Sequence, residues 1–120
     1  MENEKTSGIE TSSGRAASEL SGLLSSVRIL GIDYRINHAD VRRQNGSEAV
    51  GNIDNQACVI TVDSRLNSGP HAGSVLLHEI IEALAYRLEL DLKHERITQL
   101  EAGLIQVIRD NPKLLPCLAR

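Results

Sequence analysis

Residues 75 to 88 read VLLHEIIEALAYRL, and this stretch decides the fold expected for the chain. Its large aliphatic residues recur at intervals of three and four, which places them on one continuous stripe of a helix: Leu77, Ile80, Ile81, Leu84 and Leu88. Four helix-breaking residues, 67 to 70, come just before it. The pattern predicts an amphipathic helix from about residue 71 to residue 90.

A second helical pattern follows after a short polar connection. Asp91 is a suitable N-cap, and Asp110-Asn111-Pro112 is a stop signal. Between them lies another apolar stripe, made of Ile97, Leu100, Leu104, Val107 and Ile108. The short connection predicts that the two helices form an antiparallel hairpin. The apolar residues 114–118 are expected to pack back on the core as a tail.

The region before the helices has the two-residue periodicity of strands. We expect one strand over residues 27–36 with a bulge at Gly31, a short second strand over 49–53, and a third over 57–63. Residues 54–56 form the turn into this last strand. The predicted fold class is therefore α+β, with a small antiparallel sheet of two or three strands packed on the two-helix hairpin.

The composition divides the 120 residues into two parts. Residues 1–26 are rich in Ser, Gly, Thr and charged residues, which predicts a flexible tail. Residues 27–120 form the expected single domain. Phe and Trp are absent and only Tyr34 and Tyr86 are aromatic, so its core must be aliphatic. We assign no role to Cys58 and Cys117, which are expected to be buried or partly buried thiols.

Charge and hydropathy narrow the expected partners and location. A net charge of −3 gives no reason to expect nucleic acid or an anionic membrane as a partner. No apolar run approaches the roughly 18 to 20 residues that a membrane span requires, and the N-terminal residues do not resemble a secretory signal. We therefore expect a cytoplasmic protein that acts on a protein or peptide of unknown identity. Its oligomeric state is left open.

The chemistry of the chain is concentrated on the first predicted helix. His78 and Glu82 are four residues apart, so both side chains leave the same face and can reach one metal ion. Two ligands bind weakly, and the second helix offers His94 or Glu101 as a third. In a simple hairpin Glu101 lies closer to this face, whereas His94 reaches it only if the first helix ends early or the connection folds back. Both candidates stay open.

Glu79 follows His78 directly and points about 100° round the helix. A carboxylate there can lie beside a metal-activated water without binding the metal, so Glu79 is placed as a general base. The pattern predicts one zinc ion, or another divalent metal, and a hydrolytic reaction.

The strand over 59–63, the segment from Val75 to Leu84 and the later segment from His94 to Glu101 together resemble small zincin-like metallopeptidases of phages and prophages. In such proteins the first helix carries the motif HExxH. The resemblance implies that His78 is the first ligand, Glu79 the base and Glu82 the second ligand in place of histidine. It implies His94, or alternatively Glu101, as the third ligand. The function it implies is that of a zinc metallopeptidase.

Two other functions remain compatible with the sequence. The first is a non-catalytic binding module of phage type, which keeps the zincin scaffold and engages a host protein. The second is a structural helical hairpin that assembles through its aliphatic stripes. Substitution of Glu79 separates an enzyme from a binding module, because only an enzyme needs the base.

Overall fold

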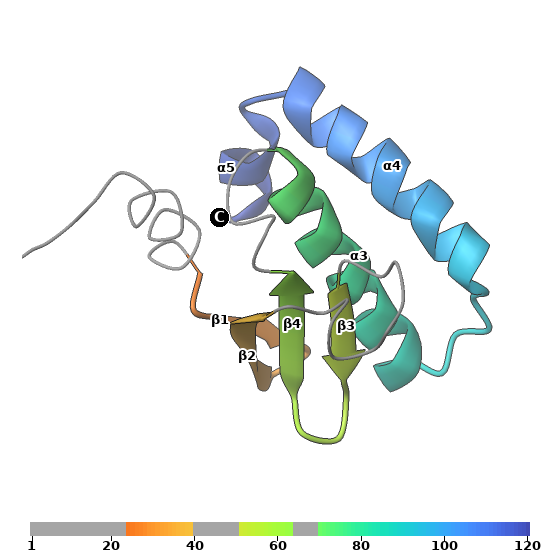
Figure 1. The fold of residues 1–120 in the computed structure, drawn as a ribbon. Helices are drawn as coiled ribbons and strands as arrows, with labels where there is room; N and C mark the ends of the chain where they lie inside the picture. Colours follow the sequence, from red (N-terminus) through yellow and green to blue (C-terminus); the bar gives the residue numbers. More distant parts are fainter. Residues whose placement is uncertain (1–23, 40–50, 64–69) are drawn as a thin grey trace, which may run out of the picture.

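A computed structural model describes residues 24–39, 51–63 and 70–120, which form an α+β fold. The strands are β1 (Ser26–Ile29), β2 (Ile32–Ala39), β3 (Gly51–Asp54) and β4 (Val59–Asp63), and the helices are α3 (Pro70–Arg87), α4 (His94–Asp110) and α5 (Leu114–Leu118). The strands form one sheet in the order β1-β2-β4-β3. Helix α3 packs on this sheet and lies between it and α4 (Figure 1). Most of the tail predicted for residues 1–26 lies outside the described residues.

The strand predicted over residues 27–36 is in fact two strands. Leu30 and Gly31 both have positive φ, 51° and 83°, and Ile29 pairs directly with Ile32. Two consecutive residues of this kind form a tight hairpin turn that matches the twist of the flanking strands. The expected bulge is therefore a chain reversal, and the described sheet has four strands instead of two or three.

The sheet is mixed, so the prediction of an antiparallel sheet was wrong for one pair of strands, β2 and β4. Strand β2 runs parallel to β4, with Ile36 beside Ile60, whereas β3 pairs antiparallel on the other side of β4. Residue alternation specifies which face of a strand is buried, but not the direction of its neighbour. Strand β4 is consequently central, and β3 lies at one edge of the sheet.

The main core lies between the sheet and α3 and is aliphatic except for one side chain. Tyr34 is fully buried on β2, within a cluster whose buried members are Ile29, Tyr34, Ile36, Ile60, Val62, Leu76 and Ala83. Its hydroxyl donates to Asn55 Oδ1 at 2.8 Å and accepts from Arg87 Nε, also at 2.8 Å. Tyr34 thereby joins the end of α3 to the turn between β3 and β4.

Helix α3 ends at Arg87, three residues before the predicted end. Glu89 adopts a positive φ of 54°, its N–H bonds to the carbonyl of Tyr86, and the N–H of Leu90 bonds to that of Ala85. This pair of bonds is a Schellman motif, which usually has glycine at the left-handed position. Because glutamate occupies that position, the early end of α3 could not be predicted from the residue types.

The second helix starts later than predicted and is less buried. Lys93, not Asp91, is the N-cap of α4, and Lys93 makes no side-chain capping bond. Ile97 is the one buried side chain of α4, although the sequence pattern indicated a whole buried stripe. The residues after α4 form helix α5 instead of a packed tail, and Leu115 and Leu118 on α5 are 54% and 69% exposed.

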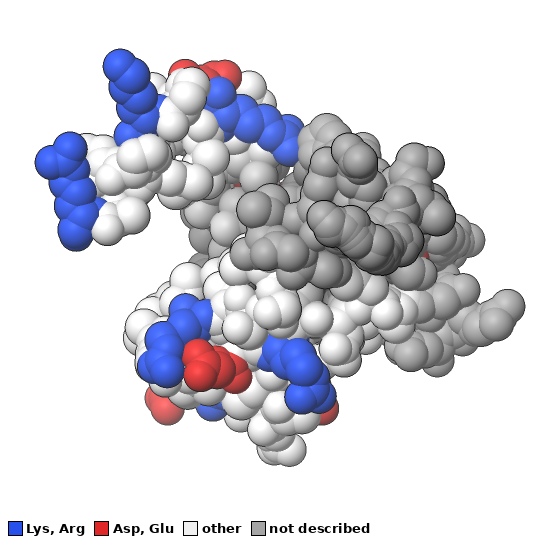
Figure 2. All heavy atoms as spheres, turned by 90° about the vertical axis from the view of Figure 1, so that its left-hand side faces the viewer, with Lys and Arg blue, Asp and Glu red and all other residues white. Residues whose placement is uncertain are grey.

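One face of the molecule shows separate charged groups and no extended region of a single charge (Figure 2). In Figure 2 the described Lys and Arg side chains stand as separate groups, some of them beside Asp or Glu. Cys58 is half-buried as expected, but Cys117 is exposed, and both are free thiols. Among the described residues, no helix combines the length and the apolar character that crossing a membrane requires.

Candidate metal centre

One face of α3 carries three polar side chains in a row. Ser74, His78 and Glu82 are spaced four residues apart and therefore lie one above another along the helix. The Nε2 atom of His78 lies 3.3 Å from Oε2 of Glu82, and both side chains are less than one-third exposed. The pair predicted from the sequence is thus formed by local helix geometry.

Helix α4 brings His94 to the same place. Its Nδ1 atom lies 3.5 Å from Oε2 of Glu82, and its ring centre is 4.8 Å from that of His78. One potential ligand atom from each of His78, Glu82 and His94 lies within 4.8 Å of the others, so this group could hold a metal ion. His94 reaches Glu82 because α3 ends at Arg87, which is one of the two conditions that the sequence set.

The two separations that involve Glu82 suit a small tetrahedral ion. Ligand atoms at about 2.1 Å from a tetrahedral zinc are separated from each other by about 3.4 Å. The separations from Glu82 Oε2 are 3.3 Å to His78 Nε2 and 3.5 Å to His94 Nδ1. Two imidazoles and one carboxylate are also a ligand set that catalytic zinc accepts, with a fourth position left for water or substrate.

Glu101, the alternative third ligand, also lies at the site but contacts a different atom. Its Oε1 lies 3.3 Å from His78 Nδ1, the ring nitrogen that faces away from Glu82. Its second oxygen accepts a hydrogen bond from the hydroxyl of Ser74. A carboxylate at Nδ1 keeps the proton on that nitrogen and leaves Nε2 unprotonated, as a metal ligand must be. Ser74 was missed, although its position four residues before His78 was a usable signal.

Glu79 lies beside this group and faces the edge of the sheet. Its side chain is buried, at 6% exposure. A Cβ atom on Gly51 of β3 would lie 3.1 Å from Glu79 Oε2 and only 2.6 Å from Val75 Cγ1. Glycine at position 51 therefore allows α3 to approach β3 closely, and the Glu79 carboxylate lies against that strand.

The surroundings of Glu79 favour its protonated form. Burial is the larger cause and the negative charge of Glu82 is the smaller, and together they raise the pKa of Glu79 from 4.5 to about 7. A carboxyl group with a pKa near neutrality can both accept and release a proton at physiological pH.

No family model, curated protein or solved structure matches this chain. The resemblance to zincin-like proteins therefore stays a proposal. The assignment of the site depends on the geometry of its own residues.

In the presence of a chelator, which keeps metals out of the site, burial of Glu79 should make the free energy of unfolding depend on pH. Because the folded state holds this proton more tightly than the unfolded state, the contribution is largest below pH 4.5 and is lost as pH rises to about 7. We expect the free energy of unfolding to fall by about 3 kcal/mol across that range. Urea denaturation of wild type and Glu79→Gln isolates the effect, since both retain the same histidines. Parallel pH profiles for the two proteins would contradict it.

Truncation of Glu101 tests whether it orients His78 or binds the metal itself. We expect Glu101→Ala to lower zinc affinity by about 10- to 100-fold, the usual effect of losing a partner of a metal-ligating histidine. Competition with a chromophoric chelator measures this affinity. The exposed Glu95 on the same helix provides a control, Glu95→Ala, which should have no effect. A loss as large as that of His78→Ala would identify Glu101 as a direct ligand.

Proposed function

We propose that the protein is a zinc-dependent hydrolase of the metallopeptidase class, with His78, Glu82 and His94 as metal ligands. The observation that carries the proposal is the convergence of two imidazoles and a carboxylate within 4.8 Å, beside a buried glutamate with a raised pKa. When bound, zinc polarises a carbonyl group and makes water acidic near neutral pH. The other parts of the reaction are carried out by the side chains of the protein.

Each side chain has a distinct role in this proposal. His78 binds through Nε2 because Glu101 occupies the Nδ1 side, and Ser74 holds Glu101 in place. Glu79 accepts the proton of the attacking water at its carboxylate and then donates it to the leaving amine. Burial raises the pKa of Glu79 toward neutrality, which suits a group that both accepts and releases a proton.

The position of Glu79 also supports a peptide as substrate. Within the described part of the chain, β3 pairs with β4 alone, so one side of β3 has no strand partner. An extended peptide can add to such an edge through main-chain hydrogen bonds. Because the Glu79 carboxylate lies against Gly51 of β3, a peptide bond held at this edge lies near the base.

Glu79→Gln is the variant that tests the enzymatic proposal. Glutamine has the same shape but cannot accept the proton, so kcat should fall by about 100- to 10,000-fold while zinc affinity changes less than about tenfold. A library of internally quenched peptides supplies the activity readout, and Glu95→Gln is the matched control on an exposed position.

The result also separates the enzyme from a non-catalytic binding module. Cleavage by the wild type that is equally fast in Glu79→Gln would remove Glu79 from the mechanism. Zinc binding without cleavage of any peptide in the library would favour a binding module on the same scaffold.

A further inference from the structure

The apolar stripe of helix α4 continues beyond the buried Ile97 into a face that no described element covers. Leu100, Leu104 and Val107 lie four and three residues apart, on one side of the helix, and are 45%, 42% and 48% exposed. Ile97, the buried residue, lies at the edge of this face that turns toward α3. Figure 1 shows α4 as the outermost layer of the fold, with α3 on one side only. Three neighbouring aliphatic side chains on an outer helix indicate a contact surface.

The charged residues at the two ends of this face are complementary. Arg96 lies seven residues before Gly103 and Asp110 lies seven residues after it, and both are exposed on the same side as the leucines. The Arg96 guanidinium donates a hydrogen bond to the exposed amide oxygen of Gln99, at 3.0 Å. If a second α4 packs antiparallel with Gly103 at the crossing point, each Arg96 lies opposite the Asp110 of the other helix.

Gly103 itself has room for such a neighbour. A Cβ added there would meet no atom within 4 Å, so nothing in the described fold requires glycine at this position. Glycine is a poor helix former, and its presence in the middle of an exposed helix has no local explanation. A helix that packs across this point would explain it, because the missing side chain lets two backbones approach closely.

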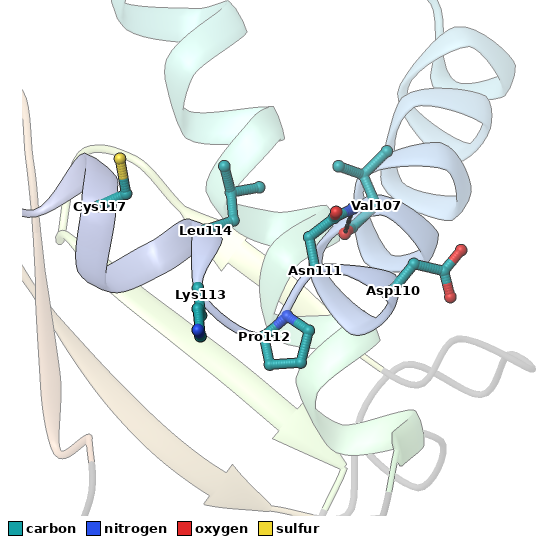
Figure 3. A pocket seen from close by; sticks show the side chains of 7 residues that line it. All are labelled: Val107, Asp110, Asn111, Pro112, Lys113, Leu114 and Cys117. Atoms are coloured by element: carbon teal, nitrogen blue, oxygen red, sulfur yellow. Dashed lines mark hydrogen bonds between the residues drawn. The ribbon is translucent and has the colours of Figure 1, made fainter.

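The C-terminal end of the same face opens into a pocket. The pocket has a volume of about 730 Å³ and is lined by Val107, Leu114 and Cys117, among others (Figure 3). In an antiparallel pair, this end of α4 meets the start of α4 from the other copy. The connection before that start carries Leu88 and Leu90, which are 52% and 49% exposed. An apolar pocket and two exposed leucines thus lie at opposite ends of α4.

We propose that this face of α4 binds a second copy of the chain, in an antiparallel pair with a two-fold axis at Gly103. We define the dimer face by its residues Arg96, Leu100, Gly103, Leu104, Val107 and Asp110. A two-fold contact requires one surface to complement itself. The dimer face meets this requirement because its opposite charges are equally distant from a central glycine. One helix face is smaller than a standard interface, so the dissociation constant is expected in the micromolar range.

Exchange of the two charges tests the proposal on the full chain. Sedimentation velocity measures the dissociation constant of wild type, Arg96→Asp, Asp110→Arg and the double variant. Each single variant places like charges opposite each other and should weaken the dimer at least about tenfold. The double variant restores opposite charges and should return to within about threefold of wild type. Thr98→Asp and Ala102→Arg place the same charges on the opposite, exposed side of α4 and should leave the dimer unchanged.

A further variant, Gly103→Leu, tests the crossing point of the two helices, and two outcomes would overturn the proposal. Gly103→Leu fills the open space without a clash inside the protomer, so it should fold, as circular dichroism will check, and be monomeric. A wild type that stays monomeric up to about 1 mM would overturn the proposal. So would a dimer that tolerates both single charge changes and Gly103→Leu, because it would use another surface. Zinc binding is measured separately, so neither outcome depends on the proposed activity.

Discussion

Replacement of His78 with alanine is expected to lower zinc affinity on the order of 1,000-fold, because zinc sites gain about 10 to 16 kcal/mol from about four ligands. Among the three ligands, His78 is expected to contribute most to zinc affinity. Its Nε2 faces Glu82 at 3.3 Å, and its Nδ1 faces Glu101 at the same distance. Its removal also leaves Glu101 without its imidazole partner and Glu82 with His94 alone. Chelator competition at fixed pH measures the change.

The matched comparison is Glu95→Ala, an exposed position one residue from His94. We expect that variant to bind zinc like the wild type. His94→Ala should also lower affinity, but less, because the His94 side chain is 75% exposed and lies 3.5 Å from its carboxylate partner Glu82. Unchanged zinc affinity in His78→Ala would contradict the proposed centre.

Truncation of Tyr34 to alanine is expected to cost about 3 to 5 kcal/mol of folding free energy. Tyr34 is fully buried and is the one aromatic side chain in the described core. Its loss leaves a cavity among aliphatic residues and also breaks the hydroxyl bonds to Asn55 and Arg87. Since small domains are stable by about 5 to 15 kcal/mol, the variant should be close to unfolding. Urea denaturation in the presence of chelator measures the loss.

Two companion variants separate packing from hydrogen bonding. Tyr34→Phe keeps the ring and should cost about 1 to 3 kcal/mol, because the half-buried Asn55 and Arg87 side chains lose their bonds to the hydroxyl. Tyr86→Ala removes a 52% exposed ring that contacts the Arg87 guanidinium at 5.1 Å, and should cost about 1 kcal/mol or less. Equal losses for Tyr34→Ala and Tyr86→Ala would contradict the described core.

The parts of the fold that the sequence predicted well have strong local periodicity. The stripe containing Ile81 and Leu84 located α3, and the run over Val59–Asp63 located β4. The features that were not predicted depend on backbone conformations that the residue types do not indicate. Leu30 and Glu89 both have positive φ, although neither is glycine or asparagine. The positive φ of Leu30 belongs to the hairpin turn between β1 and β2, and that of Glu89 belongs to the end of α3. Neither feature could be predicted from the residue type.

The same reason explains what the sequence predicted of the candidate site. The spacing of His78 and Glu82 is fixed within one helix, so their proximity could be predicted from residue numbers alone. The distance from Glu82 to His94 depends on where α3 ends and how the connection turns. Sequence reasoning therefore left His94 and Glu101 as alternatives. The structure brings both to the site, with His94 beside Glu82 and Glu101 beside the other nitrogen of His78.

The proposed function depends on whether His78, Glu82 and His94 bind a single metal ion. A crystal structure of the zinc-loaded protein, with the ion located by anomalous scattering at the zinc edge, tests it most directly. We expect one ion at about 2.0 to 2.2 Å from His78 Nε2, a Glu82 carboxylate oxygen and His94 Nδ1. Absence of an ion from these three residues after loading, or an ion bound elsewhere, would contradict it.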